Sequence, residues 1–256
     1  MENQIYKKLS NGNFYVIAFL TGIVLFYLLS VLAMFAGIMG MEYRSPGFFQ
    51  SFWDTYLTGN MGLNADLYYG ILNVSQMVGE LILAGLFVFI LKNELKKDAL
   101  RFKTEWKSLL GTIVVGFIIL LGLSFALSLI YTLFGIEGTS ENQELIESLL
   151  DGDYRFFMYF TTLLLAPFVE EILFRKLLFG VIEDKFRWKP IFAILISGVI
   201  FASIHGVDIF IFQYLGMALV LCASYSFSKN NIYVPMGIHF LNNLLSVLFY
   251  VLYSVA

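Results

Sequence analysis

The chain has 256 residues, of which 59% are hydrophobic and only 14% are charged. Soluble domains are about half apolar and about a quarter charged, so this composition excludes a soluble globular enzyme and a disordered chain. A net charge of -3 leaves no basic excess for binding nucleic acid. The single cysteine, Cys222, excludes a disulfide framework and a zinc site built from clustered cysteines.

Long apolar segments predict an all-α protein, a polytopic bundle of transmembrane helices. A helix needs roughly 20 apolar residues to cross a membrane. The segments that approach or exceed this length are residues 9–41, 67–91, 108–136, 156–182, 190–207, 209–228 and 230–256. The first is too long for the apolar core of a signal peptide, and no small-residue cleavage site follows it. We therefore expect about seven spans in a single integral-membrane domain, residues 1–256.

Basic residues gather in the loops on one predicted side of the membrane. They are Lys7, Lys8, Lys92, Lys96, Lys97, Arg101, Lys103, Lys107, Lys185, Arg187, Lys189 and Lys229. The opposite side has only Arg44 and Arg155, beside an acidic loop at 137–155. Cytoplasmic loops are rich in Lys and Arg, so we expect the amino terminus to be cytoplasmic and the carboxyl terminus external. The charged segment 92–107 either sets this topology alone or also forms an amphipathic surface helix.

Ionisable side chains inside a span are costly and usually face a cavity or a partner. Both histidines of the chain, His205 and His239, lie in apolar segments. On a helix, Glu171 and Arg175 are four residues apart and are expected to pair. Glu170 is turned about 100° away and has no partner within its own helix, as suits a general base. The alternative is a purely structural network of these charges.

Further polar residues and one proline interrupt the apolar segments. Asn243 lies four residues after His239 and Asn242 three, so both project near the histidine. Such an amide can orient a histidine or bind an oxyanion, or it can join helices by hydrogen bonds. Pro167 is expected to kink its helix and open space beside Glu170. The role of Glu80, the acid within segment 67–91, stays open.

Three motifs together resemble the signature of the CPBP family, the CAAX protease and bacteriocin-processing membrane proteins. They are Glu170-Glu171-x-x-x-Arg175, Phe201-x-x-x-His205 and His239-x-x-x-Asn243. The match covers about residues 156–256, which form the motif-bearing core. The resemblance implies a CAAX-type intramembrane endopeptidase and a multi-pass protein of a bacterial plasma membrane. Bacterial members are linked to peptide maturation, bacteriocin self-immunity and quorum-signal processing.

The resemblance also implies a role for each motif residue. Glu170 would activate water with help from His205, His239 and Asn243 would bind the oxyanion, and Glu171 and Arg175 would shape the site. The substrate would be a hydrophobic, lipidated or membrane-inserted peptide. We expect a metal-free glutamate protease without a cofactor. The alternative is a metalloendopeptidase, with zinc bound by His205, His239 and a glutamate.

Two other functions compete with proteolysis. A non-enzymatic immunity or scaffold protein would keep the motifs for folding. A small transporter would show two related halves, and no such internal symmetry occurs. Counted from the predicted span ends at about 1.5 Å per residue, Glu170 and His205 differ in depth by roughly 13 Å. His239 agrees with Glu170, which predicts a cavity open to the cytoplasmic half. The sequence leaves the oligomeric state open.

Overall fold

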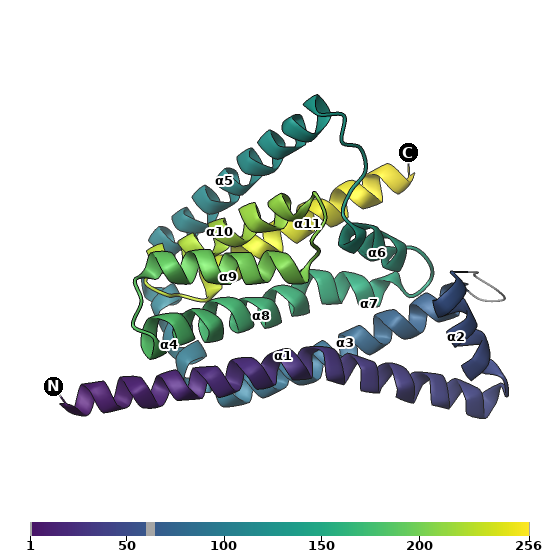
Figure 1. Ribbon diagram of the computed structural model, residues 1–256, viewed down its shortest axis with the longest axis horizontal. Coiled ribbons are helices and arrows are strands. Elements are labelled where there is room, and N and C mark those ends of the chain that lie inside the picture. Colours follow the sequence, from purple (N-terminus) through teal and green to yellow (C-terminus); the bar gives the residue numbers. More distant parts are fainter. Residues whose placement is uncertain (1, 60–64, 256) are drawn as a thin grey trace.

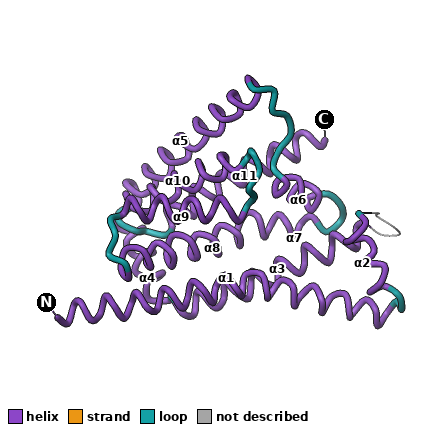
Figure 2. Tube along the Cα trace, viewed as in Figure 1, coloured by secondary structure: helices purple, strands orange, loops and turns teal. Residues whose placement is uncertain are grey.

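The computed structural model describes the backbone of residues 2–59 and 65–255 and the side chains of residues 12–59 and 66–253. Within these ranges every regular element is a helix and no strand occurs (Figure 2). The prediction of an all-α helix bundle is confirmed. Lys7 and Lys8, which contributed to the predicted orientation, lie outside the described side chains.

The described helices differ widely in length and polarity. They are α1 (Glu2–Arg44), α2 (Phe48–Thr58), α3 (Ala65–Ile90), α4 (Lys92–Thr104), α5 (Trp106–Leu133), α6 (Glu141–Leu150), α7 (Arg155–Phe160), η1 (Thr161–Leu165), α8 (Ala166–Glu171), η2 (Ile172–Leu178), η3 (Val181–Lys185), α9 (Pro190–Ile204), α10 (Ile211–Phe227) and α11 (Tyr233–Val255). The three η elements are π-helical turns, and they lie within one stretch that runs from α7 to η3.

Among the described residues, five stretches are long and apolar enough to cross a membrane. They are α1, α3, α5, the α7–η3 stretch and α11. The chain is therefore a multi-pass membrane protein. Helices α9 and α10 occupy the predicted fifth and sixth spans but have only 15 and 17 residues. Since a span needs roughly 20 residues, the count of seven spans stays a prediction.

The helices form two layers with the α7–η3 stretch between them (Figure 1). Helices α1 and α3 run antiparallel in one layer and approach closely at Gly79, where an added Cβ would lie 2.6 Å from Ser30 N. Helices α9, α10 and α11 form the other layer, with α5 packed outside α10 and α11. The central stretch supplies fully buried side chains such as Val169 and Phe174. Glu170 and Glu171 of α8 and Arg175 of η2, the residues of the first motif, thus lie inside the bundle.

The charged segment predicted at 92–107 forms helix α4, which is docked against the bundle. Its Asp98 makes a buried ion pair with Lys176 of η2, with Oδ2 2.5 Å from Nζ. Asn231 Nδ2 donates to the backbone oxygen of Asp98 at 2.9 Å. Arg101 donates to the backbone oxygen of Ser228 at 2.8 Å. These contacts fix the end of the bundle where α4, η3 and the start of α11 meet.

The central stretch and α9 are antiparallel neighbours joined by the short loop 186–189. Glu170 precedes the end of η3 at Lys185 by as many residues as His205 follows the start of α9 at Pro190. The two side chains therefore reach the same level of the bundle. The predicted difference in depth is wrong, because this span continues past residue 182 to Lys185.

Candidate active site

The predicted pair of Glu171 and Arg175 is present and fully buried. Arg175 Nε lies 3.1 Å from Glu171 Oε2, and both side chains are 0% exposed. The N–H is not aimed at this oxygen, so the contact is an ion pair without a hydrogen bond. The guanidinium carbon also lies 4.4 Å from the ring centroid of Phe201, as a cation–π contact requires. The charge of Arg175 is thus met by a carboxylate and an aromatic face.

Each histidine is held through Nδ1. His205 Nδ1 lies 2.8 Å from the backbone oxygen of Phe201, and His239 Nδ1 lies 2.9 Å from Glu171 Oε1. A carbonyl or an ionised carboxylate only accepts hydrogen bonds, so Nδ1 carries the proton in both rings. In the neutral imidazoles Nε2 is then the free acceptor. The link from His239 to Glu171 was not predicted from the sequence.

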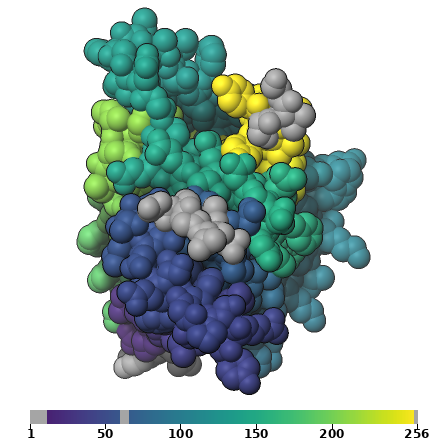
Figure 3. All heavy atoms as spheres, turned by 90° about the vertical axis from the view of Figure 1, so that its right-hand side faces the viewer, coloured from purple at the N-terminus to yellow at the C-terminus, as the bar shows by residue number. Residues whose placement is uncertain are grey.

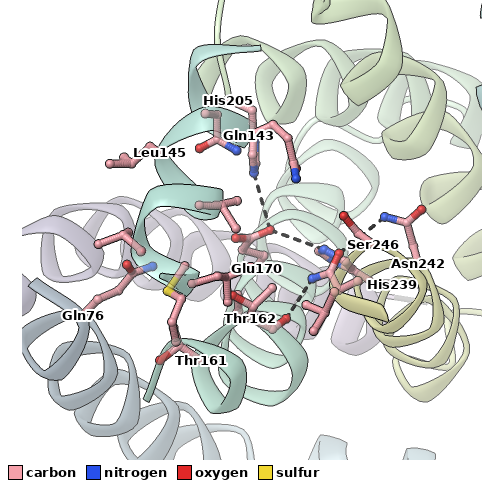
Figure 4. A pocket seen from close by; sticks show the side chains of 18 of the residues that line it. Gln76, Gln143, Leu145, Thr161, Thr162, Glu170, His205, His239, Asn242 and Ser246 are labelled. Carbon is pink, nitrogen blue, oxygen red and sulfur yellow. Dashed lines mark hydrogen bonds and ion pairs between the residues drawn. The ribbon is translucent and has the colours of Figure 1, made fainter. Parts of the chain in front are cut away.

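Both Nε2 atoms face Glu170 (Figure 4). Its Oε2 lies 3.8 Å from Nε2 of His205 and 4.0 Å from Nε2 of His239. These separations are too long for direct hydrogen bonds but allow one small molecule to bond to all three groups. Glu170 has no partner within its own helix, as expected, and it meets both histidines of the chain across helix boundaries. The structure therefore brings the three predicted residues together.

Pro167 connects Asn243 to the same site. The N–H of Ala166 bonds to the oxygen of Thr161, five residues earlier, in the π-helical manner. The next donor in this register would be residue 167, but proline has no N–H. The oxygen of Thr162 is instead bonded by Asn243 Nδ2 at 2.8 Å. The interruption expected at the proline therefore takes the form of a π-helical turn, and Asn243 satisfies the carbonyl that it releases.

A cavity of about 280 Å³ adjoins these groups. Glu170, His205, His239, Asn242 and Asn243 all line it, as do residues of α6. Asn243 has a second Nδ2 hydrogen beyond the one directed at η1. Asn242 Nδ2 lies 3.4 Å from Asn243 Oδ1, so the two amides support one another. The cavity thus combines an acid, two imidazoles and several amides.

The cavity does not extend toward the predicted cytoplasmic side. Six residues of α6 and the later half of α11 line it beside residues from the middle of the bundle, and no residue of α4 lines it. Figure 3 shows this end of the bundle, where the teal-green α6 region lies beside the yellow α11. Leu145 of α6 lines the cavity and is 52% exposed. On the predicted orientation this end is external, which is opposite to the cytoplasmic opening expected from the sequence, so the side that the cavity faces stays a prediction.

Three polar residues near the site were not assigned a role from the sequence. Tyr214 of α10 and Gln76 of α3 both line the cavity. Gln76 Nε2 donates to Oε1 of Glu80 at 3.1 Å, and no described group bonds to Oε2 of this buried acid. The sequence could have indicated this pair, because Gln76 and Glu80 are four residues apart within an apolar span. Tyr214 had no such signal, because tyrosine is common in membrane helices.

The donor set of Glu170, His205 and His239 fits zinc in chemistry but not in spacing. Two imidazoles and one carboxylate form several catalytic zinc sites, and both Nδ1–H groups are bonded as ligand histidines usually are. Zinc–nitrogen distances near 2.0–2.1 Å put tetrahedral ligands about 3.3 Å apart. The atoms here are 3.8 and 4.0 Å apart. No three His, Cys, Asp or Glu residues of the described chain are placed to hold an ion.

The fold and the site define a class: multi-pass helical membrane proteins with a buried glutamate–histidine centre. Residues 153–245 match the model of the type II CAAX prenyl endopeptidase family, described as Rce1-like. The resemblance indicated by the three motifs is confirmed. All six predicted site residues fall within the matched segment.

Curated relatives agree with this assignment. YdiL of Bacillus subtilis (strain 168), provisionally named a membrane peptidase, is 33% identical over 136 residues, which are 53% of this chain and 54% of that protein. The membrane-embedded CAAX protease MroQ of Staphylococcus aureus (strain USA300) is 29% identical over 185 residues, 69% of this chain and 73% of that protein. The alignment thus spans about half of YdiL and nearly three quarters of MroQ. No solved structure matches the chain significantly.

Proposed function

We propose that the protein is an intramembrane endopeptidase that hydrolyses a peptide bond in a hydrophobic, lipidated or membrane-inserted peptide. The single observation that carries this proposal is the meeting of Glu170 Oε2 with Nε2 of His205 and of His239, at 3.8 and 4.0 Å. The three groups share one wall of a cavity inside the bundle. A hydrolase of this family type would need such a polar centre within an apolar helix bundle.

In the first step Glu170 acts as general base on water. The water donates one hydrogen to Glu170 and the other to the free Nε2 of His205, whose Nδ1–H is occupied by the oxygen of Phe201. Glu170 takes the proton as the water oxygen bonds to the carbonyl carbon of the peptide. The electron pair of the carbonyl moves onto its oxygen and forms a tetrahedral oxyanion.

His239 and Asn243 are placed to stabilise that oxyanion. A protonated His239 donates at both nitrogens, with Nδ1–H directed to Glu171 and Nε2–H directed to the oxyanion. The second hydrogen of Asn243 Nδ2 supplies another donor. Preorganised donors of this kind stabilise developing charge strongly in a dry site. When the carbon–nitrogen bond breaks, the amine takes the proton held by Glu170, and a carboxylic acid is released.

The position of the site restricts the substrate. The buried centre lies midway along a span of 31 residues. Hydrocarbon excludes polar backbone, so a substrate must bring its scissile bond into the bundle through an apolar segment or a lipid. The leucines and isoleucine of α6 that line the cavity suit apolar side chains beside this bond. We place the protein in a bacterial plasma membrane, as its relatives are membrane proteins of bacteria.

Purified protein in lipid vesicles tests the proposal. The probe is a library of peptides with an apolar segment of membrane length flanked by a fluorophore and a quencher. The wild-type protein should cleave members of this library and incorporate heavy oxygen from labelled water into the new carboxyl terminus. Glu170→Gln should lower the rate by at least about 10²-fold, the usual contribution of a general base. Glu80→Gln, which replaces another buried carboxyl outside the cavity wall, is the matched control.

The same assay separates the competing mechanisms. Unchanged cleavage by Glu170→Gln would remove this residue from the chemistry. If a chelator abolishes cleavage and added zinc restores it, the metal-dependent mechanism replaces the metal-free one. Metal analysis of the purified protein provides a second measurement that does not depend on activity. Absence of wild-type cleavage across the library would favour the immunity or scaffold role.

A further inference from the structure

His205 is held differently from the other residues of the site. It follows the last residue of α9, and Gly206 turns the chain away with a φ of 140°. Among the described residues, its imidazole makes one hydrogen bond, between Nδ1 and the backbone oxygen of Phe201. A single hydrogen bond leaves a ring free to rotate, so another contact must aim Nε2 at Glu170.

Two aromatic rings provide that contact. The imidazole of His205 is stacked between Phe201, at 4.3 Å and 28°, and Tyr214, at 5.0 Å and 24°. Phe201 belongs to α9 itself, whereas Tyr214 comes from α10. Stacking on both faces restricts the imidazole to one plane, and within that plane the bond from Nδ1 fixes the direction of Nε2. Removal of either ring would leave one face of the histidine open to the cavity.

The hydroxyl of Tyr214 is fastened to α6. It lies 2.7 Å from Ser140 Oγ and accepts from Asn142 Nδ2 at 3.2 Å. Ser140 is the N-cap of α6, because its Oγ accepts from the backbone N–H of Gln143 at 3.1 Å. Tyr214 thus contacts the catalytic histidine with its ring and the first turn of α6 with its hydroxyl.

Helix α6 is also the wall that closes the cavity. Six of its residues, Asn142, Gln143, Leu145, Ile146, Leu149 and Leu150, line it together with Glu170 and both histidines. Asn73 Nδ2 donates to the oxygen of Leu149 at 2.9 Å, so α3 holds the far end of α6. The near end is held through Tyr214. The side chain of Tyr214 therefore both holds α6 in place and orients His205.

We propose that Tyr214 is a positioning residue for His205: its ring completes the stack that aims Nε2 at Glu170, and its hydroxyl makes this alignment depend on the docking of α6 over the cavity. The catalytic part of this inference rests on the proposed function. The site is fully assembled only when α6 covers it. Displacement of α6 by an entering substrate loosens His205, and its return restores the alignment.

Nitrogen NMR of histidine-labelled protein in lipid nanodiscs tests the geometry without an activity assay. The chain has two histidines, so the spectrum holds two imidazoles, and His205→Gln assigns them. Tyr214→Leu should shift the nitrogens of His205 toward the average of the two tautomers and leave those of His239 unchanged. Tyr214→Phe keeps the ring and should move the same signals by a smaller amount in the same direction. Wild-type signals in both variants would overturn the proposal.

The link to α6 has its own test. Asn142→Ala removes one of the two hydrogen bonds of the tyrosine hydroxyl while both aromatic rings stay, so it should move the His205 signals in the same direction as Tyr214→Phe. Tyr233→Phe is the matched control, because it removes a tyrosine hydroxyl at the opposite end of the bundle, where it donates to the oxygen of Leu95. A shift of His205 in this control, or none in Asn142→Ala, would overturn the role of α6.

The peptidase assay then reports the catalytic consequence. Loss of the hydroxyl in Tyr214→Phe, with its hydrogen bonds to Ser140 and Asn142, should lower kcat at least about fivefold. Loss of the stack as well in Tyr214→Leu should lower kcat at least about tenfold, and KM should change little in both variants. An equal loss in the two variants would contradict a role for the ring. Failure of the proposed peptidase activity would leave the NMR result standing, so the two failures are distinguishable.

Discussion

Substitutions in the buried pair of Glu171 and Arg175 should separate effects on stability most clearly from effects on activity. Each residue serves a different part of the structure. Arg175 contacts Glu171 and the face of Phe201. Glu171 contacts Arg175 and also fixes Nδ1 of His239. We consider the single changes Glu171→Gln and Arg175→Met and the double change, which all keep approximate side-chain length.

The expected magnitudes follow from full burial. Both side chains are 0% exposed, so removal of one charge leaves the other without a compensating charge and without water. Breaking a buried pair in this way costs about 3–5 kcal/mol. Replacement of both charges by neutral groups of similar volume is often close to neutral. The double variant should therefore be more stable than either single variant by a few kcal/mol.

Activity should not follow stability. The amide that replaces the carboxylate of Glu171 in the double variant can still accept from Nδ1 of His239, but it no longer offers an anion to a protonated ring. Oxyanion stabilisation should thus stay weakened after the fold has recovered. Thermal and denaturant-induced unfolding of the detergent-solubilised protein measures stability, and the vesicle assay measures kcat. A double variant no more stable than the weaker single variant would refute the pairing, and one with full activity would refute the support that Glu171 gives to His239.

Three further predictions concern other contacts. Lys176→Met should destabilise the protein by about 3 kcal/mol because it leaves Asp98 buried and unpaired, and Asp98→Asn added to it should recover stability in thermal unfolding. Asn243→Ala should reduce peptide cleavage more than Asn242→Ala, because only Asn243 bonds to the carbonyl released in η1; equal losses would argue against this difference. Ser246→Cys, in a background without the native cysteine, should react faster with a polar thiol reagent added outside than inside, and faster labelling from inside would reverse the orientation.

Local spacing predicted the features that depend on one helix. The pairing of Glu171 with Arg175 follows from their separation of four residues, and the structure contains it. The same spacing argument correctly predicted that Glu170 points away from that pair. Seven apolar segments predicted seven apolar helices, although two are shorter than a span requires. In each of these cases, the residues on which the feature depends lie within one helix and can be recognised from their spacing.

Contacts between helices could not be predicted in this way. The bond from His239 to Glu171 joins residues 68 positions apart, and no local pattern marks it. The depth of Glu170 was estimated from the wrong boundary, because a helix of 31 residues exceeds the hydrocarbon thickness and its end can lie in the interface. The role of Tyr214 depends on α6, which was predicted only as part of an acidic loop.

Charge and cavity position together restrict how a substrate reaches the site. The basic helix α4 and the acidic helix α6 lie at opposite ends of the bundle (Figure 1). The positive-inside rule, applied to this separation, predicts that α4 faces the cytoplasm and α6 the external side. On that orientation the α6 residues that line the cavity lie in the external half, so we expect a peptide to approach Glu170 from this half of the membrane. Such a peptide would contact α6 before it reaches Glu170 or the histidines. The link from α6 through Tyr214 to His205 would therefore affect catalysis as well as folding.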